Sequence, residues 1–135
     1  MTTAPTPAWM TLTLRLAALY NLLWGALVIL LPHQTLALLG LGPEARTGAV
    51  APFWQCIGMI VGVYAIAYWA AARRPDIHWP IVLTGLFGKV LGPIGFLDAA
   101  LLRGQIPSTF AWTLITNDLI WWVPFALILR HAWTN

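Results

Sequence analysis

Charged residues are scarce in this chain. They make up 8% of its 135 residues, and hydrophobic residues make up 60%, whereas a soluble domain carries roughly 25% charged residues. The formal net charge of +3 comes from seven basic and four acidic residues that are scattered along the chain. Nucleic-acid binding needs a clustered basic face, so no nucleic-acid partner is expected. The composition instead predicts a protein whose partner is the lipid bilayer.

Cysteine is nearly absent, and histidines are few. Cys56 is the single cysteine, which excludes an internal disulfide and a thiolate metal cluster. His33, His78 and His131 fall at the ends of apolar segments, without the spacing of a metal or haem site. Nucleophile triads, phosphate-binding loops and dinucleotide fingerprints are absent as well. We therefore expect no metal and no catalytic residues of these kinds.

Long apolar segments dominate what is present. They span residues 12–31, 51–72, 80–101 and 109–130, and each can cross a hydrocarbon core of roughly 30 Å as a helix. The runs are continuous rather than alternating, and they exceed the roughly 9–11 residues of a membrane β-strand. The sequence predicts an all-α fold, an integral membrane antiparallel four-helix bundle that forms one domain over residues 1–135.

The arginines predict an orientation. Arg15, the pair Arg73–Arg74 and Arg130 fall on one side of the predicted bundle, and only Arg46 and Arg103 fall on the other. Basic residues are enriched in cytoplasmic loops. We therefore expect both termini to face the cytoplasm, in a multi-pass protein of a bacterial inner membrane.

Two charges interrupt the apolar segments near their centres. Lys89 lies in IVLTGLFGKVLGPIGFL, and Asp118 lies in FAWTLITNDLIWWVPFALIL. A charge at the bilayer centre costs about 2.5–3.5 kcal/mol on insertion scales. The two residues fall within roughly 5 Å of the same depth at 1.5 Å rise per residue. We expect them to be partners, in direct contact or through one water molecule.

Other polar and aromatic residues surround this pair in the predicted bundle. Trp121 and Trp122 follow Asp118 at the helical spacings of three and four, and each remaining segment has its own polar group. A mostly apolar pocket with a few convergent polar groups is typical of a small-molecule site. The predicted ligand-binding residues are Lys89, Asp118, Asn21, Gln55, Asn117, Trp121 and Trp122.

Two prolines add polarity at the same depth. A helical proline cannot donate to the carbonyl four residues earlier, so Pro93 frees the carbonyl of Lys89 and Pro124 frees that of Ile120. A free acceptor inside a membrane needs a donor from a side chain, water or ligand. Glycines at spacings of three and four accompany Lys89, and the more common role of such a pattern is close helix packing.

The runs LYNLLWGALVILLP, PFWQCIGMIVGVYAIAYWAAARRP, HWPIVLTGLFGKVLGPIGF and TNDLIWWVPFALIL resemble a group of small four-helix bacterial membrane proteins. Members of this group often carry the label alkyl hydroperoxide reductase, and the likeness covers most of residues 12–130. The architecture is more distantly similar to DoxX-like proteins, some of which serve membrane oxidoreductases that act on quinone. The resemblance implies the fold, and no motif carries an activity over to particular residues.

These observations favour a small membrane protein that binds a lipophilic molecule at the Lys89–Asp118 site. A quinone is the first candidate, because its ring can stack on tryptophan and its carbonyl can accept a hydrogen bond. With a quinone as ligand, the expected role is auxiliary to membrane redox. Two alternatives remain. A small proton-coupled transporter or channel would use the pair as a titrating switch and would form a homo-oligomer. An assembly subunit of a larger membrane complex would use the pair only as a structural clamp.

Overall fold

The computed structural model describes residues 6–134 of the chain. Helices account for all regular structure in this part, as predicted, and the expected single domain of residues 1–135 exceeds it only at residues 1–5 and 135. The elements in chain order are α1 (Ala8–Leu30), α2 (Pro32–Leu38), η1 (Glu44–Arg46), α3 (Val50–Ala71), α4 (Trp79–Leu97), η2 (Asp98–Leu102), η3 (Ser108–Phe110), α5 (Ala111–Leu114), η4 (Ile115–Leu119) and α6 (Ile120–Thr134).

Four stretches of helix are long and apolar enough to cross a membrane: Ala8–Leu30, Val50–Ala71, Trp79–Leu102 and Ser108–Thr134. The four predicted segments are confirmed, and the largest differences are at the outer ends, where helix begins at residue 8 rather than 12 and ends at 134 rather than 130. Large apolar side chains cover the outside of the bundle. A water-facing surface would be polar, so this surface suits contact with lipid. The protein is a multi-pass helical membrane protein.

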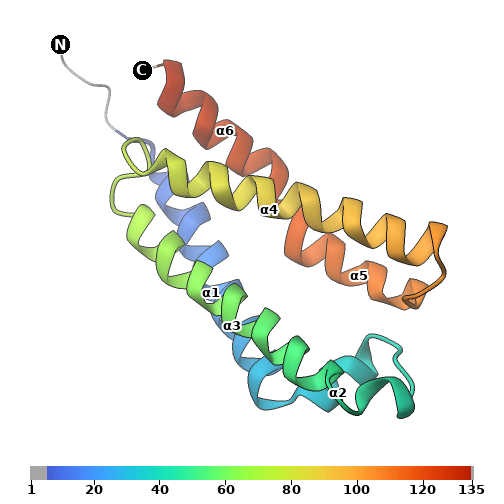
Figure 1. Cartoon of the computed structure of the whole chain (residues 1–135). Coiled ribbons are helices and arrows are strands. Elements are labelled where there is room, and N and C mark those ends of the chain that lie inside the picture. The colour runs from blue at the N-terminus through green and yellow to red at the C-terminus, as the bar shows by residue number, and fades with distance from the viewer. Residues whose placement is uncertain (1–5, 135) are drawn as a thin grey trace.

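The helices form two pairs (Figure 1). One pair is α1 with α3, and the other is α4 with the helix made of α5, η4 and α6, while α3 and α4 touch only sparsely. Glycines let α1 and α3 approach closely: a Cβ atom on Gly25 would lie 2.8 Å from the carbonyl oxygen of Gly58, and one on Gly58 would lie 2.7 Å from Val28 Cγ1. The two pairs diverge towards the end of the molecule that carries α2 and α5 (Figure 1).

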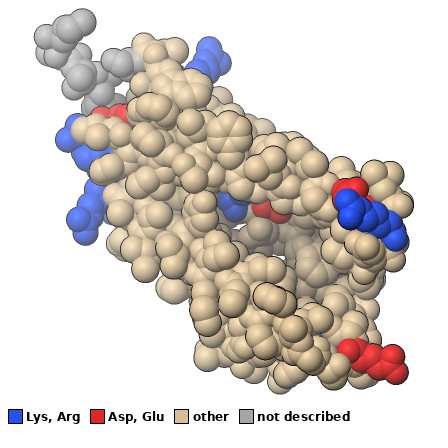
Figure 2. Space-filling view, viewed as in Figure 1, with Lys and Arg blue, Asp and Glu red and all other residues tan. Residues whose placement is uncertain are grey.

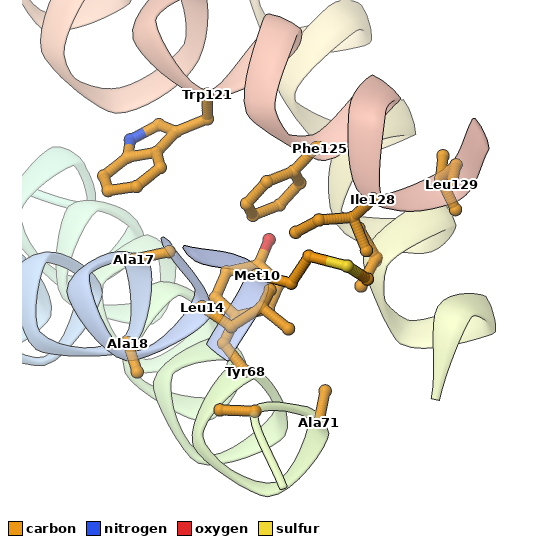
Figure 3. Close-up of a cluster of buried hydrophobic side chains, with 12 residues drawn as sticks. Met10, Leu14, Ala17, Ala18, Tyr68, Ala71, Trp121, Phe125, Ile128 and Leu129 are labelled. Carbon is orange, nitrogen blue, oxygen red and sulfur yellow. The ribbon is translucent and has the colours of Figure 1, made fainter. Parts of the chain in front are cut away.

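The apolar interior is divided into two clusters. The larger one packs side chains of α1, α3, α4 and α6 around Tyr68 and Phe125, whose rings meet edge to face with centroids 5.3 Å apart (Figure 3). The second lies towards α2 and contains Val28, Leu36 and Trp54. Trp54 donates its indole N–H to Thr35 Oγ1 at 2.8 Å, which ties α3 to α2. Asn21, Lys89 and Asp118 belong to neither cluster.

The start of α1, the end of α3, the start of α4 and the end of α6 lie at one end of the bundle (Figure 1). Trp79 and Trp133 meet edge to face there, with ring centroids 5.7 Å apart. Thr6 donates to Asp76 in the loop after α3 at 3.1 Å. Although burial alone would raise the pKa of Asp76, hydrogen bonds from Arg74 and Thr6 hold it below its ordinary value. This antiparallel arrangement is the one that the sequence predicts.

The glycine contact between α1 and α3 predicts the effect of a single methyl group. Gly25→Ala should lower the free energy of unfolding by about 1–3 kcal/mol, because the new Cβ meets backbone that cannot turn away. Gly62→Ala is the matched control, since a Cβ there meets no atom within 4 Å and alanine favours the helix by up to about 1 kcal/mol. Thermal unfolding in detergent compares the two. Equal stability of both variants would show that the close approach of α1 and α3 does not stabilise the fold.

Candidate functional site

A cavity of about 190 Å³ lies at mid-depth between the two helix pairs. Figure 2 shows a hollow in the middle of the face turned to the viewer, with charged atoms of both signs inside it. Polar residues of all four membrane segments meet here. The lining residues are Asn21, Ile60, Val61, Tyr64, Tyr68, Gly85, Gly88, Lys89, Asn117 and Asp118.

Lys89 is 5% exposed and reaches from α4 to the fourth membrane segment. Its Nζ donates to the carbonyl oxygen of Asn117, and it lies 5.9 Å from the ring centre of Trp121. An ammonium in the membrane needs such acceptors, because no bulk water replaces them. The lysine is therefore held by a backbone oxygen and an aromatic face.

A π-helical turn, η4, supplies that backbone oxygen. The amide of Ile120 donates to the carbonyl of Ile115, five residues earlier, and one-turn π segments are often found at functional sites. Carbonyls in this turn accept from side chains: the indole of Trp121 donates to Thr116 at 3.0 Å, and Lys89 donates to Asn117. Tyr20 of α1 also donates to the hydroxyl of Thr116 at 2.9 Å. The irregular turn thus binds groups from α1, α4 and α6.

The carbonyl that Pro93 frees has found a donor. Trp122 Nε1 donates to the carbonyl oxygen of Lys89 at 3.0 Å. The sequence predicted that this acceptor needs a partner, and the contact confirms it. Lys89 is therefore fixed at two points, because its backbone is bound by α6 and its side chain by η4.

Asp118 is 6% exposed and lies at the edge of the same cavity. Its Oδ1 accepts from the Asn117 side chain at 3.0 Å. The ion pairs within 4.0 Å among the described residues are Arg74–Asp76 and Arg103–Asp98. Lys89 and Asp118 therefore form no direct ion pair. Asn117 connects them, because its backbone carbonyl accepts from Lys89 and its side-chain amide donates to Asp118. A bridge through one water molecule stays a prediction.

Asn21 brings an unused acceptor to the cavity. It is 4% exposed, and its Oδ1 is buried without a hydrogen-bond partner among the described residues. A buried acceptor left unpaired costs about 1–3 kcal/mol. Tyr68 lines the same cavity, with its hydroxyl close to Gly85. The site therefore holds a polar atom, Asn21 Oδ1, that nothing in the described part of the fold satisfies.

A second cavity, of about 300 Å³, lies on the other side of Asp118. Asn117, Asp118 and Val61 line both cavities. The walls of the second are largely aromatic, with the rings of Trp54 and Phe110 meeting edge to face at 5.8 Å. Its remaining lining residues are Trp24, Ile57, Gly92, Gly95, Phe96, Ile106, Thr113 and Leu114. The polar pocket and the aromatic pocket are therefore neighbours that share three lining residues.

The glycines of α4 open this space rather than pack against a helix. Gly85 and Gly88 line the first cavity, and Gly92 and Gly95 line the second. A Cβ on Gly88 or Gly95 would meet no atom within 4 Å. The expected packing role is therefore wrong for these two positions. At Gly85 a Cβ would collide with the Tyr68 hydroxyl, so this glycine leaves room for the tyrosine.

The structure brings together four of the seven predicted site residues. Asn21, Lys89, Asn117 and Asp118 line the cavity. The ring of Trp121 faces the Lys89 ammonium, and the indole of Trp122 donates to the Lys89 carbonyl.

Gln55 lies apart from this cluster. Its Nε2 donates to the carbonyl of Ile29 at 2.8 Å, and it lines neither of the two cavities. Sequence reasoning missed Tyr68, which lines the cavity opposite Gly85; no signal in the sequence marked it.

Comparison with known proteins adds no relative: no family model, curated protein or solved structure matches the chain.

The contact between Trp122 and the freed carbonyl can be tested by pairing two substitutions. Trp122→Phe should lower the free energy of unfolding by about 1–3 kcal/mol, because it leaves the Lys89 carbonyl without a donor. In a Pro93→Ala background the same change should cost clearly less, since the alanine amide can donate to that carbonyl. Thermal unfolding of the four proteins measures the difference. An equal cost in both backgrounds would contradict the role assigned to Trp122.

Proposed function

We propose that this protein binds a small lipophilic molecule with a polar ring head at the paired cavities around Asp118. A quinone is the first candidate. The protein acts as a binding protein, auxiliary to membrane redox, rather than as an enzyme with its own catalytic residues. The bound molecule would place its head among Asn21, Lys89 and Asp118 and its ring in the aromatic cavity.

The observation that carries this proposal is the unpartnered Oδ1 of Asn21. It is buried beside a cavity that also holds Lys89 and Asp118. A purely structural clamp would satisfy its own polar atoms, because an unpaired buried acceptor lowers stability. A ligand with hydrogen-bonding groups provides the missing partners.

The chemistry of the lining favours a molecule that both donates and accepts. The Lys89 ammonium and the Tyr68 hydroxyl suit the carbonyl oxygens of a quinone, while Asn21 Oδ1 and Asp118 suit the hydroxyls of its reduced form. The rings of Trp54, Phe96 and Phe110, with neighbouring centroids 5.8–6.0 Å apart, line the neighbouring cavity. Flat rings pack well against such walls. Saturated acyl chains could pack against the apolar walls but could not form hydrogen bonds with the polar lining residues.

The location of the cavity also suits a ligand that enters from the bilayer. Ile60 is 59% exposed on the outer surface and also lines the first cavity. Gly88 of α4 is likewise exposed and lines it. The cavity therefore opens sideways between α3 and α4, where these helices touch sparsely. An amphipathic molecule can reach it without crossing the aqueous phase.

A second candidate is a proton-coupled transporter or channel. One observation favours it: Asp118 and Asn117 line cavities on both sides, so the carboxylate stands between two spaces. A single small bundle would need to form a homo-oligomer to build a pore. An assembly subunit of a larger complex needs no cavity at all, and the cavities are the argument against that role.

The proposed setting is a bacterial inner membrane with both termini in the cytoplasm. The arginine distribution and the resemblance to small bacterial four-helix proteins, including the distant DoxX-like ones, support it. A cysteine introduced by Asp76→Cys in a Cys56→Ser background should then be labelled only from the cytoplasmic side. Labelling from the periplasm would reverse the orientation.

Ligand-dependent stability tests the proposal. Added quinone should raise the thermal unfolding temperature of the wild type. Asp118→Asn should keep the fold, because its shape is nearly unchanged, and should reduce the shift. Asn21→Leu should be as stable as the wild type or more stable without ligand, since it removes an unpaired acceptor, and should lose most of the shift.

Gln55→Leu is the control for a polar membrane residue outside the cavity. It should lower stability by about 0.6 kcal/mol and retain the full quinone-dependent shift. The binding proposal fails if the wild type shows no shift with any quinone or lipid tried. It also fails if Gln55→Leu loses the shift as completely as Asn21→Leu.

A further inference from the structure

A groove of about 390 Å³ runs along the outer surface between α1 and α3, away from the polar cavity. Small residues on both helices hollow it out, and large apolar residues form its rims. The lining residues are Ala18, Leu19, Leu22, Ala65, Ile66, Trp69, Ala70 and Arg73. The walls are apolar except at one end, where Arg73 closes the groove.

A second arginine lies at that same end. Arg15 precedes Leu19 by one turn of α1, and its guanidinium carbon lies 5.7 Å from the ring centre of Trp69. Trp69 and Arg73 both line the groove, and Arg73 follows Trp69 by four residues, just beyond the end of α3 at Ala71. Arg15, Trp69 and Arg73 therefore lie at the same end of the groove.

The two cations are not neutralised by acidic residues of the described chain. Asp76 pairs with Arg74 at 3.4 Å, Asp98 pairs with Arg103, and Asp118 is in the central cavity. Glu44 lies in η1, beyond the opposite end of α1. Arg15 and Arg73 form no ion pair within residues 6–134. Figure 2 shows basic atoms gathered at the end of the bundle where α3 meets the loop to α4.

The depth of the groove corresponds to part of one leaflet. From Arg15 to Leu22 the helix advances roughly 10 Å at 1.5 Å per residue. Arg73 lies just beyond the end of α3, at the level of the headgroups, and Arg15, seven residues into α1, lies beside Trp69 near that same end. The apolar part of the groove extends inward from them. Basic pockets between membrane helices at this level bind lipid headgroups.

We propose that this groove binds an anionic phospholipid, with an acyl chain against the alanines and the phosphate group between Arg15 and Arg73. The groove provides the shape for the chain, and the two guanidinium groups provide the charge complement for the headgroup, since arginine matches phosphate geometry well. The site is independent of the central cavity. It concerns a resident lipid that holds α1 and α3 together.

Native mass spectrometry with lipids retained tests the proposal. The protein is exposed to equal amounts of phosphatidylglycerol and phosphatidylcholine with identical acyl chains. The wild type should retain the anionic lipid preferentially. In the Arg15→Gln/Arg73→Gln variant this preference should fall by about fivefold for each arginine removed.

The control variant is Arg74→Gln/Arg130→Gln, which removes the same charge from the same end of the bundle. It should keep the wild-type preference. An equal loss in this control would assign the effect to overall surface charge and overturn the site.

Shape is tested separately with Ala70→Leu, because Ala70 is exposed in the groove. This substitution leaves every charge in place and should lower retention of both lipids severalfold. Unchanged retention in Ala70→Leu, or no headgroup preference in the wild type, would also overturn the proposal.

Discussion

The rest of the structure depends on one constraint: the ammonium of Lys89 must be satisfied in the middle of a membrane. A charge there costs about 2.5–3.5 kcal/mol on insertion scales. A hydrogen bond to a charged group returns about 1.5–3 kcal/mol, and an aromatic face about 0.5–2 kcal/mol. The Asn117 carbonyl and the Trp121 ring together therefore offset the cost without a direct carboxylate contact. The departures from regular helix near Lys89 provide these contacts.

The same constraint explains why the interior is split. The two apolar clusters pack tightly on either side of the polar layer, and the polar layer itself is loosely packed and contains the cavity. Glycines in α4 keep that layer open, and the sparse contact between α3 and α4 gives it access to lipid. A bundle built for stability alone would fill this space with leucine. The open polar layer is the physical basis of the proposed binding function.

The sequence predicted the membrane helices because continuous apolar runs of this length have few other stable structures in lipid. It also predicted that the carbonyl of Lys89, four residues before Pro93, needs a donor, since proline removes the helical hydrogen bond to it. It did not predict the π-helical turn at Ile115–Leu119, because one inserted residue leaves no signal in hydropathy. That turn decides which atom of the fourth segment faces Lys89, so the sequence could not show that Lys89 binds the Asn117 carbonyl instead of contacting Asp118 directly. Gln55 was assigned to the site because it is polar. In the structure it lies at another depth along α3 and lines neither cavity.

The most direct test of this account is a double-mutant cycle at the two central charges. Lys89→Met or Asp118→Leu alone should lower the free energy of unfolding, because each removes one of the two opposite charges that Asn117 connects in the polar layer. The double variant should be less destabilised than the sum of the two, since both charges are then gone. Unfolding free energies that simply add would show that Lys89 and Asp118 are independent, and the account of a shared polar centre would be wrong.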